Sequence, residues 1–362
     1  MDIVKIVITG GPCAGKSTAM SKIQKEFIKM GYLVLFIAET ATELITGGIT
    51  PINDPDFQSH LLNLQIEKEA TYIQAAKSIG AEKVLIVCDR GVIDNKAYMT
   101  DEQFESILYK TPYSEIEVRD SYDAVFHLVT AAKGAVEFYT TENNAARTET
   151  PEQAAELDDK IISAWTGHSH FRIIDNIGSF EDKINRLISE ISSFLGEPEP
   201  LEIERKFLIK YPNIEWLESL PNCQRVEIIQ TYLNSSSDEE VRVRQRGLNG
   251  IYSYYKTTKK NISSLKRIEI EKRLSSDEYL ELLMNADTSR RQIRKTRYCL
   301  TYKNNYLELD IYPFWNDKAI LEIELSNEND SIDIPDEIKI IKEVTDDDSY
   351  KNANLAIERA DA

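Results

Sequence analysis

The sequence predicts two domains: an α/β domain with a parallel sheet, followed by an α+β domain of about eight antiparallel strands that form a closed or nearly closed barrel. The chain has 362 residues, which fits two domains at roughly 150 residues each. In the first half, short apolar runs alternate with helical patterns, as in βαβ units. In the second half, most segments show the two-residue alternation of antiparallel strands.

Five strands and three helices are expected in the first half. The strands are residues 4–9, 32–38, 83–88, 123–129 and 171–175, and the helices are residues 17–30, 60–79 and 180–195. Two prolines at 198 and 200 then prevent a continuous helix and favour an extended linker. We therefore expect a first domain at 1–196, a linker at 197–200 and a second domain at 201–362. The alternative is a plain loop inside one domain.

Eight strands and one clear helix are expected in the second half. The strands are residues 201–209, 228–233, 240–246, 252–258, 267–273, 292–302, 306–312 and 319–325. A capping-box-like start at Ser275 predicts a helix that includes residues 279–284. The pairs Asn249-Gly250 and Asn304-Asn305 are typical of hairpin turns.

The composition is that of an ordinary globular protein, with 42% apolar and 29% charged residues. No apolar run approaches the roughly 20 residues of a membrane span, and no secretory signal is visible. The formal net charge of −18 disfavours nucleic acid as a partner. Four widely spaced cysteines argue against a disulfide framework or a zinc cluster. We expect a cytoplasmic protein, and the sequence leaves its oligomeric state open.

The motif Gly-Gly-Pro-Cys-Ala-Gly-Lys-Ser, which begins at Gly10, fits G-x-x-x-x-G-K-[ST] between the first strand and the first helix. Gly10 and Gly15 permit a tight turn in which successive N–H groups point into one concavity. The following helix adds its positive N-terminal end. Lys16 is expected to reach the outer phosphates and Ser17 to ligate Mg²⁺, with Thr18 beside them.

Asp89 closes the third apolar run and is the candidate Walker-B carboxylate for Mg²⁺. Arg90 follows it, and this Asp-Arg pair is similar to one in small-molecule kinases of the P-loop class. Arg147 lies where such kinases carry a lid that stabilises the transferring phosphate, with a solvated loop arginine as the alternative. Glu39 is either an acceptor-site carboxylate or an ordinary acid at a helix start.

As a whole, the first half resembles the kinase-like P-loop ATPases that include nicotinamide riboside kinase domains. This resemblance implies binding of ATP or GTP with Mg²⁺. Residues 95–98 lack the aspartate of the guanine-reading N-K-x-D motif, so the chain does not resemble an ordinary switch GTPase.

Charged residues recur at two-residue spacing in the second half, with apolar residues between them. The acidic positions are Glu202, Glu204, Glu269, Glu271, Glu308, Asp310, Glu322 and Glu324, and the basic positions are Lys206, Arg242, Arg244, Lys256, Lys295 and Arg297. On one strand this pattern would indicate a solvent-facing surface. Its repetition on most strands, with both signs of charge, favours charged faces that line a lumen. A divalent cation on the acids and a polyphosphate on the bases would offset the cost of burying these charges.

The run Glu202-x-Glu204-x-Lys206, with the later basic and Glu-x-Glu pairs, resembles the CYTH, or triphosphate tunnel metalloenzyme, superfamily. The resemblance implies that Mg²⁺ or Mn²⁺ is held by Glu202, Glu204, Glu322 and Glu324. It implies that phosphate is held by Lys206, Arg242, Arg244, Lys256, Lys295 and Arg297. The order of the two halves resembles the family of the fly photoreceptor translocation-defect protein and its bacterial relatives.

Three functions are compatible with these features. The first is a nucleotide-binding P-loop domain joined to a metal-dependent tunnel that hydrolyses tripolyphosphate or a nucleoside triphosphate. The second is a nucleotide-controlled binding module whose tunnel holds a phosphorylated ligand or a lipid head group without turnover. The third is a kinase that acts on a small nucleoside-like substrate. In each case the expected partners are nucleoside triphosphates and polyphosphate-like small molecules.

Overall fold

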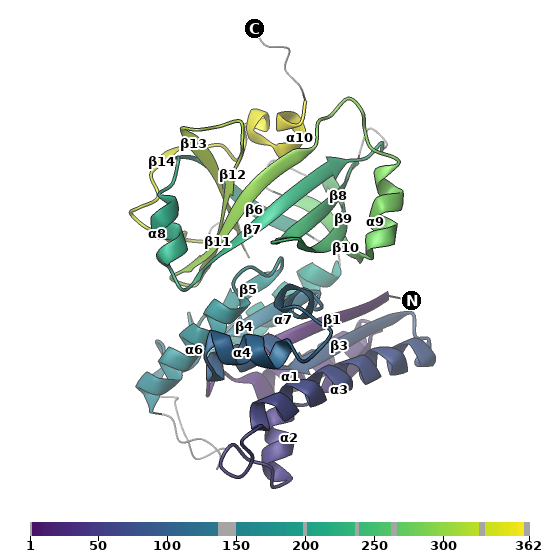
Figure 1. Cartoon of the computed structure of the whole chain (residues 1–362), viewed down its shortest axis with the longest axis vertical. Helices are drawn as coiled ribbons and strands as arrows, with labels where there is room; N and C mark the ends of the chain where they lie inside the picture. The colour runs from purple at the N-terminus through teal and green to yellow at the C-terminus, as the bar shows by residue number, and fades with distance from the viewer. Residues whose placement is uncertain are drawn as a thin grey trace. The chain divides into compact units, whose positions relative to one another are not determined.

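The computed structural model describes residues 2–136, 150–197, 201–235, 239–261, 266–325 and 330–357. For residues 201, 202, 260, 261 and 266–268 it describes the backbone alone. The chain divides into two compact units, Met1–Ser189 and Glu190–Ala362, which Figure 1 shows in different colours along the chain. The expected linker at 197–200 lies largely outside the described residues.

The first unit is built on a five-stranded parallel sheet with the order β2-β3-β1-β4-β5. The strands are β1 (Asp2–Thr9), β2 (Leu33–Ile37), β3 (Lys83–Asp89), β4 (Ala124–Leu128) and β5 (Phe171–Ile174). The helices are α1 (Lys16–Lys29), α2 (Thr40–Thr46), α3 (Phe57–Ile79), η1 (Val92–Tyr98), α4 (Asp101–Leu108), α5 (Glu115–Arg119), α6 (Pro151–Trp165) and α7 (Phe180–Leu195). This architecture confirms the predicted α/β class.

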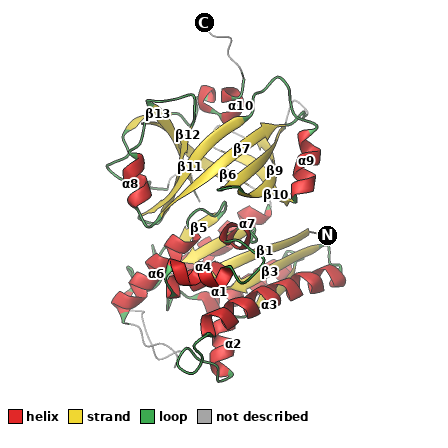
Figure 2. Ribbon diagram, viewed as in Figure 1, coloured by secondary structure: helices red, strands yellow, loops and turns green. Residues whose placement is uncertain are grey.

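The central strands of this sheet are apolar because helices cover the sheet on both sides (Figure 2). Ile6, Val87 and Val125 are completely buried. Parallel pairing aligns the carboxyl ends of β1, β3 and β4, with Ile8 opposite both Asp89 and Phe126. The loop after β1, the end of β3 and the segment after β4 therefore meet at one edge of the sheet.

The second unit contains a closed antiparallel barrel. Its strands are β6 (Leu201–Lys210), β7 (Cys223–Tyr232), β8 (Glu240–Leu248), β9 (Ile251–Asn261), β10 (Lys266–Leu274), β11 (Ile293–Tyr302), β12 (Asn305–Ile311), β13 (Lys318–Glu324) and β14 (Ile340–Glu343). The sheet order is β10-β9-β8-β7-β11-β12-β13-β6-β14, and pairing of β10 with β6 closes eight of these strands into a barrel. β14 pairs with the other end of β6. This confirms the predicted barrel.

Helices cover the outer, apolar face of the barrel strands. Leu217 of α8 (Ile214–Ser219) packs with Leu300 and Leu321. On another part of the outer face, Tyr279 of α9 (Ser276–Leu283) packs with Val243. The inner face is left for the charged side chains of the same strands.

Apolar side chains fill the barrel interior at one end. This cluster contains Leu208, Tyr232, Ile293, Tyr312, Ile320, Val344 and Ala356, and it is packed against by Trp315, Tyr350, Ala353 and Leu355. Two of these partners belong to α10 (Asn352–Leu355), and Tyr350 ends η3 (Asp348–Tyr350). The side-chain hydroxyl of Tyr312 donates a hydrogen bond to Asn352 Oδ1 at 2.6 Å.

Two hairpins have two-residue turns in the left-handed backbone region. Asn249 and Gly250 have φ values of 53° and 85°, as the Asn-Gly signal predicts. The second turn consists of Lys303 and Asn304, with φ values of 44° and 65°. It therefore lies one residue earlier than the expected Asn304-Asn305 pair, because Asn305 begins β12. No helix among the described residues is both long enough and apolar enough to cross a membrane.

Candidate phosphate sites in the two units

The loop between β1 and α1 has a backbone that its two motif glycines make possible. Gly10 and Gly15 have φ values of 145° and 92°. A Cβ at Gly10 would lie 2.1 Å from the carbonyl oxygen of Leu128, and one at Gly15 would lie 2.5 Å from the Phe180 ring. Cys13 is also left-handed, with φ of 58°. The loop is therefore a tight turn that most side chains would disrupt.

Lys16, Ser17 and Thr18 open α1 directly after this loop. Lys16 Nζ donates a long hydrogen bond of 3.4 Å to the carbonyl oxygen of Gly10, so its side chain reaches back across the loop. Burial, with the positive charge of Arg90, lowers the pKa of Lys16. Ser17 and Thr18 are exposed. The loop, the lysine and the two hydroxyls thus lie together at the N-terminus of α1, where the helix dipole favours an anion.

Asp89 and Arg90 lie at the carboxyl end of β3, as expected. Asp89 Oδ1 is buried, and no described group hydrogen-bonds to it; burial raises the pKa of this carboxyl group. Arg90 has φ of 68° and donates from Nε to Glu39 Oε1 at 2.6 Å. Burial alone would raise the pKa of Glu39, but Arg90 and Lys16 outweigh it and lower this pKa to about 2.

Asp94 is part of the same site and was not expected from the sequence. It is 1% exposed, accepts a hydrogen bond from the Thr9 hydroxyl, and lies 3.6 Å from Arg90 Nη1. Its only sequence signal was its position at the start of a short helix, where it accepts from Gly91 N–H at 2.7 Å. Arg147 lies outside the described residues.

One wall of the barrel interior, formed by β6, β11, β12 and β13, carries a connected set of ion pairs. Lys206 Nζ lies 2.7 Å from Glu322 and 3.3 Å from Glu204. Arg297 donates to Asp310 from Nε at 2.7 Å and from Nη2 at 2.6 Å, and to Glu322 at 2.6 Å. Further pairs join Arg297 to Glu308 and Lys295 to Asp310. The register places Glu322 opposite both Lys206 and Glu308, so these side chains share the inner face.

The wall formed by β8, β9 and β10 carries a second set. Arg244 pairs with Glu271, which also accepts a hydrogen bond from Thr257 Oγ1 at 2.9 Å. Lys259 pairs with Glu269, and Arg242 lies 3.8 Å from the same carboxylate. Arg246, on the same face as Arg242 and Arg244, is 2% exposed. Both signs of charge therefore occupy both walls of the lumen.

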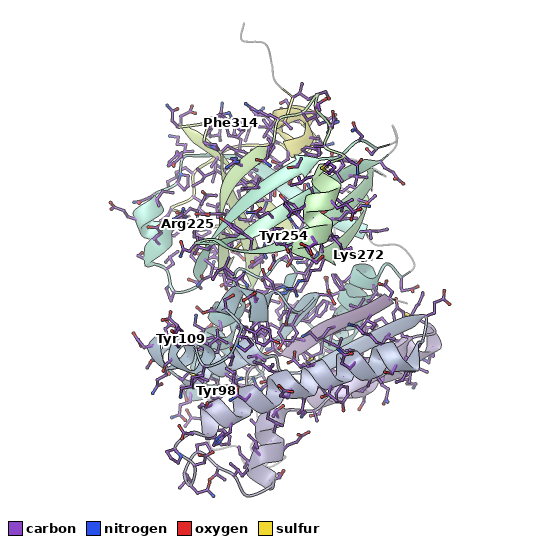
Figure 3. All side chains as sticks on the ribbon, turned by 45° about the vertical axis from the view of Figure 1, so that its right-hand side comes forward. Tyr98, Tyr109, Arg225, Tyr254, Lys272 and Phe314 are labelled. Carbon is purple, nitrogen blue, oxygen red and sulfur yellow. The ribbon has the colours of Figure 1, made fainter. Side chains whose placement is uncertain are left out.

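Lys256 does not lie with these residues. It is opposite Val243 on β8 and Lys272 on β10, which places it on the outer strand face. Lys272 is exposed and is labelled in Figure 3. The buried lysine of β9 is Lys259, three residues later. Because strand residues alternate with a period of two, a shift of three residues reverses the face.

The predicted metal ligands are only partly described. Glu204 and Glu324 are register partners across β6 and β13, and Glu322 lies two residues before Glu324. Glu324 is exposed, and the side chain of Glu202 lies outside the description. Among the side chains that are described, no three acidic, histidine or cysteine groups gather closely enough to hold a metal ion. The donors that are present are carboxylate oxygens, the type that Mg²⁺ and Mn²⁺ prefer.

Comparison with known families agrees with both halves of this geometry. Residues 5–183 match a family model described as an AAA domain, and residues 200–349 match one described as a CYTH domain. The chain carries an AAA domain followed by a CYTH domain. These matches confirm the two resemblances expected from the sequence, although Lys256 departs from its expected place.

Solved structures also match part of the chain. The inorganic triphosphatase NE1496 is 28% identical, with 44% of this chain and 95% of that chain covered and a TM-score of 0.30. The PH1819 protein from Pyrococcus horikoshii OT3 is 27% identical, with 35% and 80% covered and a TM-score of 0.28. No curated protein matches the chain.

Proposed function

We propose that the CYTH domain binds a triphosphate chain, as tripolyphosphate or a nucleoside triphosphate, and hydrolyses it with Mg²⁺ or Mn²⁺. The observation that carries this proposal is a closed barrel whose inner face holds basic side chains from four strands, β6, β8, β9 and β11, beside carboxylates. Buried charges of this number are costly in an empty core. A ligand with several negative charges, together with a cation, complements both sets.

The basic side chains of both walls would contact phosphate oxygens. Arg244 and Arg297 can each offer two parallel N–H donors, the geometry that suits phosphate. Lys206, Lys259 and Lys295 would supply further positive charge as negative charge develops on the leaving oxygens.

The carboxylates would hold the divalent cation. Burial opposes ionisation of Glu322, but Lys206, Lys295 and Arg297 outweigh it and hold the pKa of Glu322 well below its ordinary value. This group is therefore a charged oxygen donor at neutral pH, and Glu204 lies on the neighbouring strand. A bound divalent cation would supply an activated water molecule and neutralise phosphate charge.

The test is phosphate release from tripolyphosphate and from ATP by the full chain carrying Lys16→Ala, with Mg²⁺, with Mn²⁺ or with EDTA. We expect Arg244→Ala and Glu322→Gln each to lower the rate at least 100-fold, about 2.7 kcal/mol. Arg225→Ala is the matched control, because Arg225 is an exposed arginine on β7 (Figure 3). Metal-dependent release that is unaffected by Arg244→Ala and Glu322→Gln would place hydrolysis elsewhere.

A second candidate is ligand binding in the tunnel without turnover. It is favoured by the engagement of Glu322 with Lys206 and Arg297, and by the lack of a three-ligand metal cluster among the described side chains. The same assay separates the two candidates when it is combined with calorimetric titration of tripolyphosphate. Tight binding that Arg244→Ala weakens, with no release under any divalent metal, would support binding alone.

For the AAA domain we propose binding of ATP or GTP with Mg²⁺ at the loop between β1 and α1. Lys16 would contact the outer phosphates, and Ser17 and Asp89 would hold the metal. The buried Asp89 Oδ1 fits this role, since none of the described groups satisfies it. Titration of the two nucleotides against the wild type and Lys16→Ala should show tight binding only for the wild type.

The Arg90–Glu39 pair beside this loop favours phosphoryl transfer to a small nucleoside-like acceptor as the reaction of the AAA domain. An ionised carboxylate beside a phosphate site can accept a hydrogen bond from a hydroxyl group of the acceptor and so orient that group for transfer. The test is transfer of the γ-phosphate of ATP to a panel of nucleosides, which Lys16→Ala should abolish. An absence of transfer to every acceptor would leave nucleotide binding or hydrolysis as the role of this domain.

A further inference from the structure

We propose that Thr130, Asp158 and Lys183 are positioning residues that hold the phosphate loop in its anion-binding conformation. The proposal rests on the nucleotide binding proposed above for the AAA domain. The three residues lie after β4, on α6 and on α7, far from the loop in sequence. They are 0%, 0% and 3% exposed.

Asp158 holds the start of the loop. Its Oδ1 accepts hydrogen bonds from the backbone N–H of Gly11 at 2.8 Å and of Thr130 at 3.2 Å, and lies 2.9 Å from His127 Nε2. Its Oδ2 lies 3.0 Å from Lys133 Nζ. Burial disfavours the charged carboxylate, but His127, Lys133 and the backbone N–H of Gly11 lower its pKa. Asp158 is therefore a buried carboxylate that ties the loop to the segment after β4.

Successive carbonyl groups of the loop are held from the same neighbouring segments. The Thr130 hydroxyl donates to the carbonyl oxygen of Pro12, and the backbone N–H of Ala131 donates to that of Cys13 at 3.4 Å. Lys183 Nζ donates to the carbonyl oxygen of Ala14 at 3.1 Å.

The ammonium group of Lys183 also has partners outside the loop. It donates to Asn176 Oδ1 at 2.7 Å and to the carbonyl oxygen of Val129. Burial lowers the pKa of Lys183 to about 8, so the side chain is mainly charged at neutral pH. Its position is therefore fixed by the segments after β4 and after β5, as well as by the loop.

Because the peptide bond is planar and trans, the contacts that fix the carbonyl groups of the loop also fix the directions of the N–H groups that follow them. In such a peptide the carbonyl of one residue and the N–H of the next point in opposite directions. When the carbonyls of Pro12, Cys13 and Ala14 point toward the segment after β4 and toward α7, the following three N–H groups point away from them. Three neighbouring N–H groups turned away from the protein interior form the kind of nest that binds phosphate.

The conformation that these contacts hold is not one that the loop would adopt freely. Cys13 lies in the left-handed region at φ of 58°, which is unfavourable for a residue with a Cβ. The peptide groups on both sides of Cys13 are held by the Thr130 hydroxyl and by the Ala131 N–H. Lys183 holds the next carbonyl, that of Ala14. Loss of either side-chain contact should let the loop relax and turn N–H groups away from the ligand.

The experiment measures the Lys16-dependent affinity of the full chain for a fluorescent ATP analogue with Mg²⁺. Thr130→Val replaces the hydroxyl group by a methyl group, and we expect it to weaken binding at least tenfold, whereas Thr130→Ser should remain within threefold of the wild type. Rescue by serine tests the hydrogen bond, because valine and threonine have nearly the same shape. Lys183→Met should also weaken binding at least tenfold.

A matched pair on α6 tests the carboxylate. Asp158→Ala should weaken binding at least tenfold, while Asp159→Ala should not, because Asp159 is exposed and pairs only with Lys133 among the described residues. Wild-type affinity in Thr130→Val and Lys183→Met, with binding lost in Lys16→Ala, would overturn the positioning role and leave the proposed function standing. Equal binding by the wild type and Lys16→Ala would overturn both.

Discussion

Glu39 and Arg90 form an ion pair beside the phosphate loop, and we expect the contribution of this pair to the free energy of unfolding to depend on pH. The folded pKa of Glu39 is about 2, below the ordinary value of 4.5. The stabilisation is therefore complete above pH 4.5 and is lost as the pH falls toward 2. Because the side chain is 28% exposed, we expect about 2 kcal/mol after solvent screening.

Urea unfolding of the wild type and Glu39→Gln is the measurement. The difference in unfolding free energy between the two should be about 2 kcal/mol at pH 7 and less than half of that at pH 3. Glu43→Gln removes a neighbouring exposed carboxylate and serves as the charge control. A difference that stays constant over this pH range would show that the ion pair does not stabilise the fold.

Two lysines of β9 test whether residues on the inner face of the barrel act in phosphate release. Lys259 faces the lumen and pairs with Glu269, whereas Lys256 lies on the outer face opposite Val243. We expect Lys259→Ala to lower phosphate release from tripolyphosphate at least tenfold, because a buried charge that complements the phosphate is lost. Lys256→Ala should remain within twofold, and equal loss in both variants would contradict the assigned strand faces.

Lys256 and Lys259 also show which feature of the barrel could not be predicted from the sequence, namely which lysine of β9 faces the interior. The alternation in β8 and β13 indicates which face of each strand is charged, because apolar residues separate Arg242 from Arg244 and Glu322 from Glu324. In β9 the run Lys256-Thr-Thr-Lys259 offers a lysine on each face. Only the register with β8 decides between them, and register is a property of the assembled sheet.

At the level of elements, the β11–β12 hairpin has a turn that its residues do not favour. Lys303 and Asn304 are both left-handed, and Asn-Gly is the preferred pair for such a turn. We expect the double change Lys303→Asn with Asn304→Gly to raise the unfolding free energy by about 1 kcal/mol. The ion pair of Lys303 with Asp333 is largely exposed and offsets little of this gain.

Chemical denaturation of the double variant checks this prediction. Gly250→Ala is the opposite change in the β8–β9 turn, where φ is 85°, and it should lower stability by a similar amount. An unchanged midpoint in both variants would show that turn strain does not limit the stability of the barrel.

Helix α6 was not predicted, although it carries Asp158. Its start has a clear signal, because Thr150 caps the helix in a capping box with Gln153, and Pro151 occupies the first turn. The five parallel strands and the eight barrel strands were predictable because their apolar runs and alternation are local patterns. The contacts of Thr130, Asp158 and Lys183 with the phosphate loop were not predictable, since they join residues up to 169 positions apart.

At the level of the whole molecule, the two proposed phosphate sites belong to separate compact units. We therefore expect Lys16→Ala to remove nucleotide binding by the AAA domain and to leave tripolyphosphate hydrolysis within twofold. Arg244→Ala should do the reverse. Measuring both activities in both variants of the full chain checks this expectation, and loss of both activities in either variant would reveal that the sites depend on each other.

The aromatic and aliphatic cluster around Tyr312 determines how a ligand could enter and leave the barrel. Because apolar side chains fill one end of the barrel, a linear anion bound as we propose would enter at the opposite end and be released from that same end. Long polyphosphate could then be trimmed from its tip but could not be threaded from end to end. A bulky group on the substrate, such as a nucleoside, would remain outside the open end while the phosphate chain occupies the interior.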